Sequence, residues 1–209
     1  MRYSREEAEF DRAIGFLDAT FALALTLLVT TLDVSGSAAP WESLGALDDE
    51  FGAQFIAFAI SFAVIGHYWL VHHTMVASFT AIDTRVILAN LVLIAAVVLI
   101  PFATEAVGDP ETENLPLPVA VLAINVAAAS ALSALVYWLA YRHELLDPRP
   151  SVAVMRANLM ASLGPAAVFL ISIPIAYAIS PDAGKLSWLA LVVLQPLLGR
   201  RIDAARKAG

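Results

Sequence analysis

Ionisable and polar side chains interrupt the long apolar stretches of this sequence, and they are the residues that could do chemistry. The first is Asp18, which lies six residues into an apolar segment from Ala13 to Leu32. About 20 apolar residues span the hydrocarbon core of a bilayer as a helix. A carboxylate inside such a segment costs about 2.5–3.5 kcal/mol on insertion scales, so it faces protein or water and marks a functional position.

A second feature of this segment is a stripe of leucines alternating with threonines. At about 100° per residue, the side chains of Leu23, Thr26, Leu27 and Thr30 share one face about 100° wide, and Asp18 falls on the opposite side. One face of the segment therefore presents small hydroxyls alternating with leucines, and the other presents a carboxylate that needs a partner. The same pattern is typical of an ordinary membrane helix whose threonine hydroxyls bond back to their own backbone carbonyls.

The composition indicates which elements position these residues. The chain has 209 residues, is 60% hydrophobic and has a mean hydropathy of +0.77, well above the 45–50% apolar content typical of a soluble domain. We therefore expect an all-α membrane protein with a single domain. Cysteine is absent, which excludes disulfides, thiolate metal sites and cysteine nucleophiles. Residues 1–11 carry four acids, which argues against a signal peptide and indicates an amphipathic lead-in.

Six membrane spans are predicted from the apolar stretches. They cover about residues 13–32, 50–73, 84–104, 116–141, 152–179 and 186–199. Pro101 is expected to end the regular helix of the third span, and Gly164, Pro165 and Pro174 to kink the fifth. The sixth span is short, so it is expected to tilt little or to be extended by its flanks.

The basic residues give the predicted orientation. Eleven fall on one side of the six-span arrangement and only Lys185 on the other: Arg2, Arg5, Arg12, Arg85, Arg142, Arg149, Arg156, Arg200, Arg201, Arg206 and Lys207. This asymmetry predicts cytoplasmic termini in a multi-pass protein of a bacterial-type inner membrane. The opposite side collects acids, including Asp33 and the run from Asp48 to Glu50, and would attract cations.

This topology brings a set of polar residues to similar depth near the cytoplasmic face. They are Arg12, Asp18, His72, His73, Arg85 and Asn90. We interpret them, together with Phe16, as a lock that fixes the first helix against the second and third through hydrogen bonds, because a buried carboxylate needs partners.

Two other chemistries compete with this interpretation. His67, His72 and His73 are not spaced one helical turn apart, so no metal site is expected. An Asp–His set could instead relay protons in a transporter, and this alternative stays open. No motif of a hydrolase, metalloprotease or nucleotide-binding enzyme occurs in a fitting context, so neither enzymatic activity nor a cofactor is expected.

A family resemblance is carried by residues 12–105. The stretch R-x-x-x-F-L-D-A-T-F-A-L-A-L-T-L-L-V, from Arg12 to Val29, resembles the signature of the transmembrane protein 175 family of endosomal and lysosomal potassium channels. SFAVIGHYWLVHH at 61–73, D-x-R at 83–85 and IPFATE at 100–105 extend it, whereas the last three spans match only in number and length. Phe16 and Asp18 match the family's Phe-Ser-Asp, but Leu17 stands where the family has serine.

The resemblance implies a potassium-selective, cation-permeable channel whose first helix lines the pore. It places a hydrophobic constriction at Leu23 and a threonine layer at Thr26, with Leu27 and Thr30 continuing the face. It also implies a homotetramer in the lipid membrane, with potassium ions as the permeant species and no nucleic-acid partner. The sequence contains no TVGYG-like filter, so side-chain rings and a dewetted neck would set selectivity. A proton-coupled transporter and a non-conducting scaffold remain the alternatives.

Overall fold

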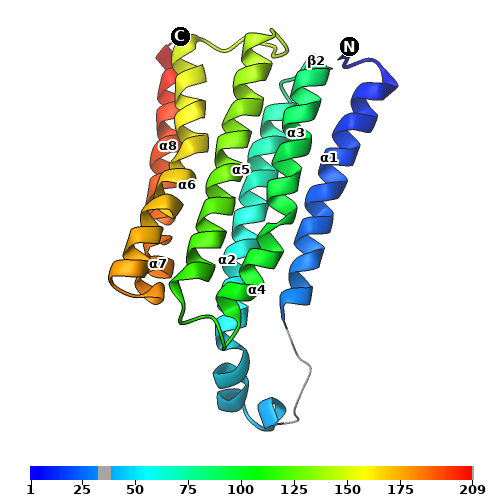
Figure 1. The fold of residues 1–209 in the computed structure, drawn as a ribbon. Coiled ribbons are helices and arrows are strands. Elements are labelled where there is room, and N and C mark those ends of the chain that lie inside the picture. The colour runs from blue at the N-terminus through cyan, green and yellow to red at the C-terminus, as the bar shows by residue number, and fades with distance from the viewer. Residues whose placement is uncertain (33–38, 209) are drawn as a thin grey trace.

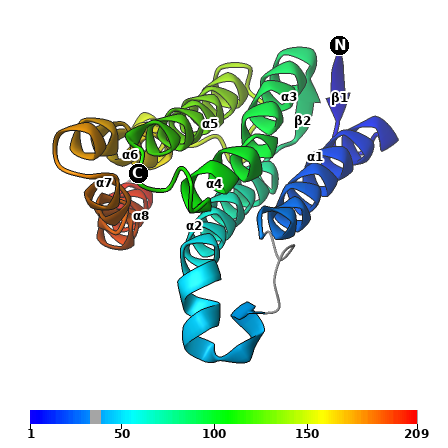
Figure 2. The same cartoon turned by 60° about the horizontal axis from the view of Figure 1, so that its bottom comes forward.

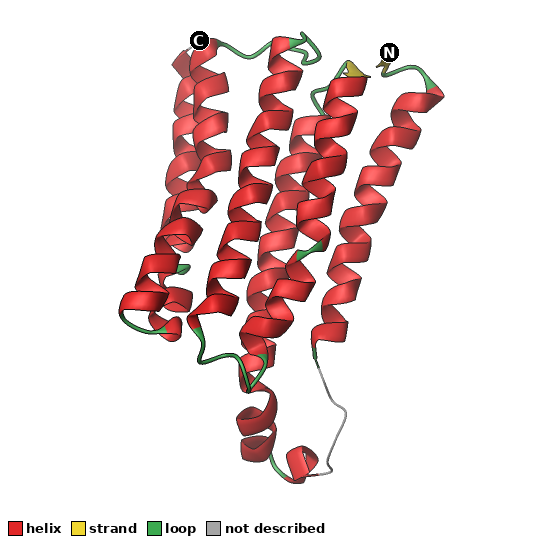
Figure 3. Cartoon of the chain, in the orientation of Figure 1, coloured by secondary structure: helices red, strands yellow, loops and turns green. Residues whose placement is uncertain are grey.

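The protein is a bundle of long helices in the computed structural model, which describes residues 1–32 and 39–208 (Figure 1). The elements are β1 (Arg2–Ser4), α1 (Ala8–Leu27), η1 (Leu28–Thr31), η2 (Ala39–Glu42), α2 (Leu44–Val76), β2 (Ala81–Asp83), α3 (Thr84–Val98), α4 (Ile100–Gly108), α5 (Pro116–Arg142), α6 (Val152–Ala178), α7 (Pro181–Ser187) and α8 (Ala190–Ala208). The expected all-α class is confirmed, with one small two-stranded sheet added to it (Figure 3).

Five helical segments of the described chain are long and apolar enough to cross a membrane. They are α1 with η1, α2, α3 with α4, α5, and α6. The sixth expected span, 186–199, falls on the end of α7 and the first half of α8, with Trp188 and Leu189 between the two helices. α8 then continues as a helix through the basic residues from Arg200 onward, so its apolar half covers only 190–199.

Short polar side chains begin several of these helices, because they accept hydrogen bonds from amides that the first turn leaves unpaired. Ser43 Oγ accepts from the Ala46 amide at 3.0 Å, and Asp83 Oδ1 accepts from the Val86 amide at 2.9 Å. The regular helix of the third span ends at Val98, close to the end expected at Pro101, but the chain then continues as α4, with Pro101 in its first turn. The positions expected to kink the fifth span lie inside α6, which stays helical through both Pro165 and Pro174.

Close approach between helices depends on small residues at two places. Gly108 in α4 lies so near α2 that an added Cβ would be 3.0 Å from Gln54 Cα. At Gly184 in α7, an added Cβ would be 2.8 Å from Ala176 Cβ in α6. These glycines let the backbones pack where any side chain would clash.

The helix arrangement places α5 centrally and α1 at one edge (Figure 2). α5 packs against α3, α4 and α6, whereas α1 packs against α2 and α3. One face of α1 is therefore left without a neighbour among the residues that the structure describes.

A two-stranded antiparallel sheet at the N-terminus was not predicted. It pairs Arg2 with Asp83 and Ser4 with Ala81. Arg5 reinforces it, since its Nη1 donates to the Ala77 carbonyl at 2.9 Å. Strands of three residues show no periodicity, and their pairing depends on a partner about 80 residues away. The sheet ties the start of α1 to the connection between α2 and α3.

The two termini lie at the same end of the bundle (Figure 1). The start of α1, the start of α3, the end of α5 and the start of α6 are also at that end, and these are segments that carry the predicted basic side. α7, which contains Lys185, is at the other end (Figure 1). Of the acids assigned to the opposite side, Asp33 lies outside the described residues.

Candidate pore-lining face and its polar supports

One face of α1 packs into the bundle. Its buried residues recur three, four or seven positions apart: Phe10, Leu17, Phe21 and Ala24, with Leu28 following in η1. This spacing is the signature of one helical face. Phe21 and Ala24 are 1% and 0% exposed, so the rotation of α1 against α2 and α3 is fixed by close packing.

The Leu–Thr stripe lies on the face of α1 that points away from this packing. Leu23 is 54% exposed and Leu27 is 37% exposed, and Thr26 and Thr30 are exposed as well. The predicted grouping of these four residues on one side is therefore present in the structure. The edge position of α1 leaves this stripe free to meet something outside the chain (Figure 2).

The two threonine hydroxyls of the stripe bond to their own helix. Thr26 Oγ1 donates to the Leu23 carbonyl at 2.8 Å, and Thr30 Oγ1 donates to the Leu27 carbonyl at 2.7 Å. This is the bonding pattern of an ordinary membrane helix. It also uses only the hydroxyl hydrogen, so each oxygen keeps its lone pairs for another partner, such as a cation.

Asp18 finds its partner on α2. The Trp69 indole Nε1 donates to Asp18 Oδ1 at 3.2 Å, and the Trp69 ring stacks on His73 with centroids 5.3 Å apart. Asp18 is thus held by a neutral donor rather than by the arginine or histidine that the sequence suggested.

His72 and Asn90 form a second contact, between α2 and α3. His72 Nε2 lies 2.9 Å from Asn90 Oδ1, and the side chains are 2% and 1% exposed. Asn90 Nδ2 donates to the Val86 carbonyl at 2.9 Å, so Oδ1 is the acceptor and Nε2 carries the proton. The His72 ring also contacts Phe21 of α1, with centroids 5.4 Å apart.

Arg85 belongs to a third contact, at the end of the bundle. Its Nη1 donates to His143 Nε2 at 3.2 Å, and His143 Nδ1 donates to Asp83 Oδ2 at 2.5 Å. Burial by itself would raise the pKa of Asp83, but the Val86 amide and His143 outweigh it and lower that pKa below its usual value. This set joins the cap of α3 to the end of α5.

Arg12 and Phe16 stand apart from these contacts. Both are exposed, Phe16 to 56%, and Arg12 has no hydrogen bond or ion pair with the described residues. Leu17, in place of the family's serine, is 3% exposed and faces the core. Within one chain, the residues predicted to form a single lock therefore divide into three separate contacts and two exposed residues.

Two residues of these contacts, Trp69 and His143, are absent from the set predicted from the sequence. Trp69 lies one helical turn before both His72 and His73 on α2, and this spacing is the signal that could have pointed to it. His143 follows α5 in a loop, and only its proximity to the start of α3 makes it a partner of Asp83. Among the described residues, no three His, Cys, Asp or Glu side chains are placed to hold a metal ion.

Comparison with known proteins identifies the family. The model of the endosomal/lysosomal potassium channel TMEM175 family matches residues 12–101. A potassium channel of Streptomyces collinus is 30% identical over 156 residues, which cover 72% of this chain and 74% of that protein. A potassium channel of Chamaesiphon minutus is 30% identical over 147 residues, covering 69% of this chain and 70% of the relative.

Solved structures share the fold. A crystal structure of a lysosomal potassium-selective channel TMEM175 homologue from Chamaesiphon minutus has a TM-score of 0.75 at 21% identity, covering 91% of this chain and 98% of that one. A variant of the potassium channel MtTMEM175 has a TM-score of 0.62 at 19% identity, covering 96% and 95%. The relatives are potassium channels and not enzymes, and the chain spans most of their length. This chain therefore belongs to the TMEM175 potassium channel family.

Proposed function

We propose that the chain forms a homotetrameric, potassium-permeable channel in which the stripe on α1 surrounds a central pore. The observation that carries the proposal is that packing of Phe21 and Ala24 turns Leu23 and Thr26 away from the bundle, at its edge. One such helix cannot enclose a pore, and cyclic symmetry is the economical way to repeat it around an axis. Family membership favours conduction over proton-coupled transport or a non-conducting scaffold.

Leu23 and Thr26 would have different roles in the pore. A ring of Leu23 side chains would form the narrow apolar neck, which closes by excluding water. A ring of Thr26 oxygens, with their hydrogens engaged by the Leu23 carbonyls, would offer lone pairs to a dehydrating potassium ion. Leu27 and Thr30 would continue this lining.

The polar contacts would act as supports for the pore helix. Asp18 bonded to Trp69 fixes α1 on α2, and His72 bonded to Asn90 fixes α2 on α3 next to Phe21. We assign Arg85 to the end of the bundle, where it steadies the α2–α3 connection that carries β2.

Arg12 and Phe16 have a different place in the tetramer. They lie eleven and seven residues before Leu23, which puts them on the same side of the helix as the stripe at about 100° per residue. We therefore assign them to the contact between copies of α1 rather than to a lock within one chain.

The proposed channel also assigns the sixth span and the orientation in the membrane. α8 would serve as the sixth span, with its apolar half in the bilayer and its basic half at the surface. The protein would lie in the bacterial inner membrane, with the basic end, and hence both termini, in the cytoplasm. Potassium ions would be the preferred permeant species of a cation-permeable pore, with no cofactor.

The test is a bilayer recording of purified protein in potassium and sodium gradients. Leu23→Ala should raise the leak current, because smaller side chains widen the neck and lower the cost of hydrating it. Its matched control is Leu25→Ala, since Leu25 packs against the core on another face of the same helix. Equal conductance of Leu23→Ala and wild type, with normal assembly, would show that α1 does not line the pore.

Selectivity is tested at the threonine layer. Thr26→Val keeps the shape but removes the oxygen, so it should reduce the preference for potassium over sodium, measured as the bi-ionic reversal potential. Thr31→Val is the control, because Thr31 is 7% exposed and its hydroxyl bonds to the Leu28 carbonyl inside the bundle. The same shift of the reversal potential in both variants would show that Thr26 has no special role.

A further inference from the structure

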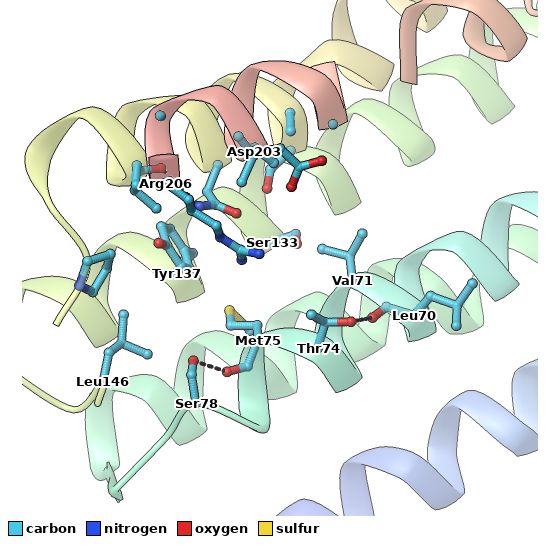
Figure 4. Close-up of a pocket in the computed structure, with 18 of the residues that line it drawn as sticks. Leu70, Val71, Thr74, Met75, Ser78, Ser133, Tyr137, Leu146, Asp203 and Arg206 are labelled. Carbon is cyan, nitrogen blue, oxygen red and sulfur yellow. Dashed lines mark hydrogen bonds between the residues drawn. The ribbon is translucent and has the colours of Figure 1, made fainter. Parts of the chain in front are cut away.

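A cavity of about 930 Å³ lies between four helices on the side of the bundle away from α1 (Figure 4). Its walls are the second half of α2 from His67 onward, the second half of α5, the first half of α6, and α8. The loop before α6 closes one end of it. All these segments belong to the end of the bundle where the termini lie (Figure 1). Neither the pore stripe nor its supporting contacts on α1 take part in it.

The lining is divided by chemistry. On the α2 wall, the apolar Leu70, Val71 and Met75 lie beside His67, Thr74 and, just after the helix, Ser78, and the Thr74 and Ser78 hydroxyls are taken up by carbonyls of α2. Ile202 of α8 adds to the apolar surface. Polar side chains gather from the other helices: Ser133 and Tyr137 from α5, Asn158 and Ser162 from α6, and Asp203 and Arg206 from α8. Figure 4 shows Arg206 extending from α8 toward Ser133 and Tyr137. A pocket with an apolar wall and a polar, cationic end suits an amphiphile rather than a wholly polar or wholly apolar ligand.

The free positive charge in the cavity is that of Arg206. The other lining arginine, Arg149, is already paired with Glu144 at 2.6 Å. Arg206 has no hydrogen bond or ion pair with any residue that the structure describes. Asp203, also from α8, is the acid that offsets it within the lining.

The charge of α8 as a whole decides the sign of the ligand. Its last two to three turns carry four basic residues, Arg200, Arg201, Arg206 and Lys207, against the single acid Asp203. A basic helix end next to a pocket between membrane helices is the setting in which proteins bind anionic lipid headgroups. The cavity volume is at the upper end of the range for ligand pockets, large enough for a headgroup and the first part of an acyl chain.

We propose that this cavity binds an anionic phospholipid, with its phosphate at Arg206 and its acyl chain along Leu70, Val71 and Met75. The polar groups of Tyr137 and Asn158 flank the phosphate position, and the apolar α2 wall guides the chain toward the bilayer. The bound lipid fills the space between α2 and α8, which the protein side chains leave open, and so fixes α8 against the bundle.

The test is native mass spectrometry of the purified oligomer, with phosphatidylglycerol and phosphatidylcholine of equal chain length as probes. Wild type should retain phosphatidylglycerol in preference to phosphatidylcholine. Arg206→Ala should weaken retention of phosphatidylglycerol about tenfold, the effect of losing one charged hydrogen bond. The matched control is Arg200→Ala on the same helix, because Arg200 does not line the cavity and its loss should leave retention unchanged.

A second variant fills the cavity without changing its charge. Gly199 lines the cavity, and a Cβ added there meets no atom within 4 Å. Gly199→Leu should therefore fold, since leucine favours a helix more than glycine does, and should displace the lipid by occupying its space. Thermal unfolding of Gly199→Leu at or above the wild-type midpoint would verify that the loss of lipid is local.

Four results would overturn the proposal. Equal losses in Arg206→Ala and Arg200→Ala would show a general surface attraction. Equal retention of both lipids would show that the negative charge of the headgroup does not contribute to binding. Competition by inorganic phosphate, with no dependence on chain length, would identify a phosphate site instead. Dissociation of the oligomer by Gly199→Leu, with lipid still bound, would show that the cavity receives a second copy of the chain.

Discussion

The hydrogen bond between His72 and Asn90 makes a sharp prediction about stability. Asn90→Leu keeps the approximate size of the side chain but removes the only polar partner of the His72 ring, because His72 Nδ1 is buried and unpaired in the described structure. The remaining imidazole would be 98% buried with both nitrogens unsatisfied, given its exposure of 2%. A buried polar group left without its partner costs about 1–3 kcal/mol.

The membrane setting lowers this figure. Hydrogen bonds between membrane helices average about 0.6 kcal/mol, because groups in the unfolded state also find partners. The His72 pair should exceed that average, since its two side chains are almost completely buried. We expect a loss of about 1–2 kcal/mol, which reduces the ratio of folded to unfolded protein about 5- to 30-fold. For a chain of this size the midpoint should fall by about 2–8 °C.

The assay is thermal unfolding in detergent, followed by size exclusion, with two comparison variants. Asn125→Leu is the matched control. Asn125 Nδ2 is buried without a hydrogen-bond partner among the described residues, so its removal leaves no other group unpaired. The double variant His72→Leu with Asn90→Leu should recover most of the loss, since replacing both partners by apolar groups is nearly neutral. If Asn90→Leu melts like Asn125→Leu, or if the double variant is less stable than either single one, the bond does not hold α2 to α3.

Two further predictions concern packing and pH. Gly108→Ala should destabilise the fold by about 1–3 kcal/mol, because its Cβ would lie 3.0 Å from Gln54 Cα. Gly66→Ala is the control: a Cβ there meets nothing within 4 Å, so this variant should be neutral or stabilising by up to about 1 kcal/mol. Equal melting temperatures of the two variants would contradict this prediction. Because the pKa of Asp83 is lowered in the folded state, its contribution to stability is complete above the ordinary value of 3.8 and is lost as the pH falls through the lowered pKa. His143→Gln should make the loss of folding stability at low pH smaller, as measured by thermal melting between pH 6 and pH 3. An unchanged dependence of the melting temperature on pH would show that His143 does not hold the Asp83 carboxylate.

Much of the fold follows from local patterns in the sequence. The predicted spans 84–104, 116–141 and 152–179 agree closely with α3–α4, α5 and α6, because apolar length alone identifies a membrane helix. Spans 13–32 and 50–73 lie on α1 with η1 and on α2, whose helices begin five or six residues earlier, at Ala8 and Leu44. Helix ends depend on capping and on neighbouring segments, so composition determines them less well.

The grouping of Leu23, Thr26, Leu27 and Thr30 was also determined by the sequence, since side chains three and four positions apart must share a helical face. Which face turned inward was decided by tertiary packing. Phe21 and Ala24 fit against α2 and α3, and the stripe was left outside. The sequence placed Asp18 opposite the stripe, and its need for a partner was correct.

The identity of that partner was decided by the tertiary structure alone. Depth in the membrane put Arg12, His72 and Arg85 near Asp18, yet Trp69 is the residue that reaches it. Depth gives one coordinate of a side chain, whereas a hydrogen bond also requires the rotation and separation of two helices, and these come from packing along their whole length. The β1–β2 pairing and the cavity beside α8 have the same origin: each joins segments far apart in the chain, and no local period encodes which distant surfaces meet.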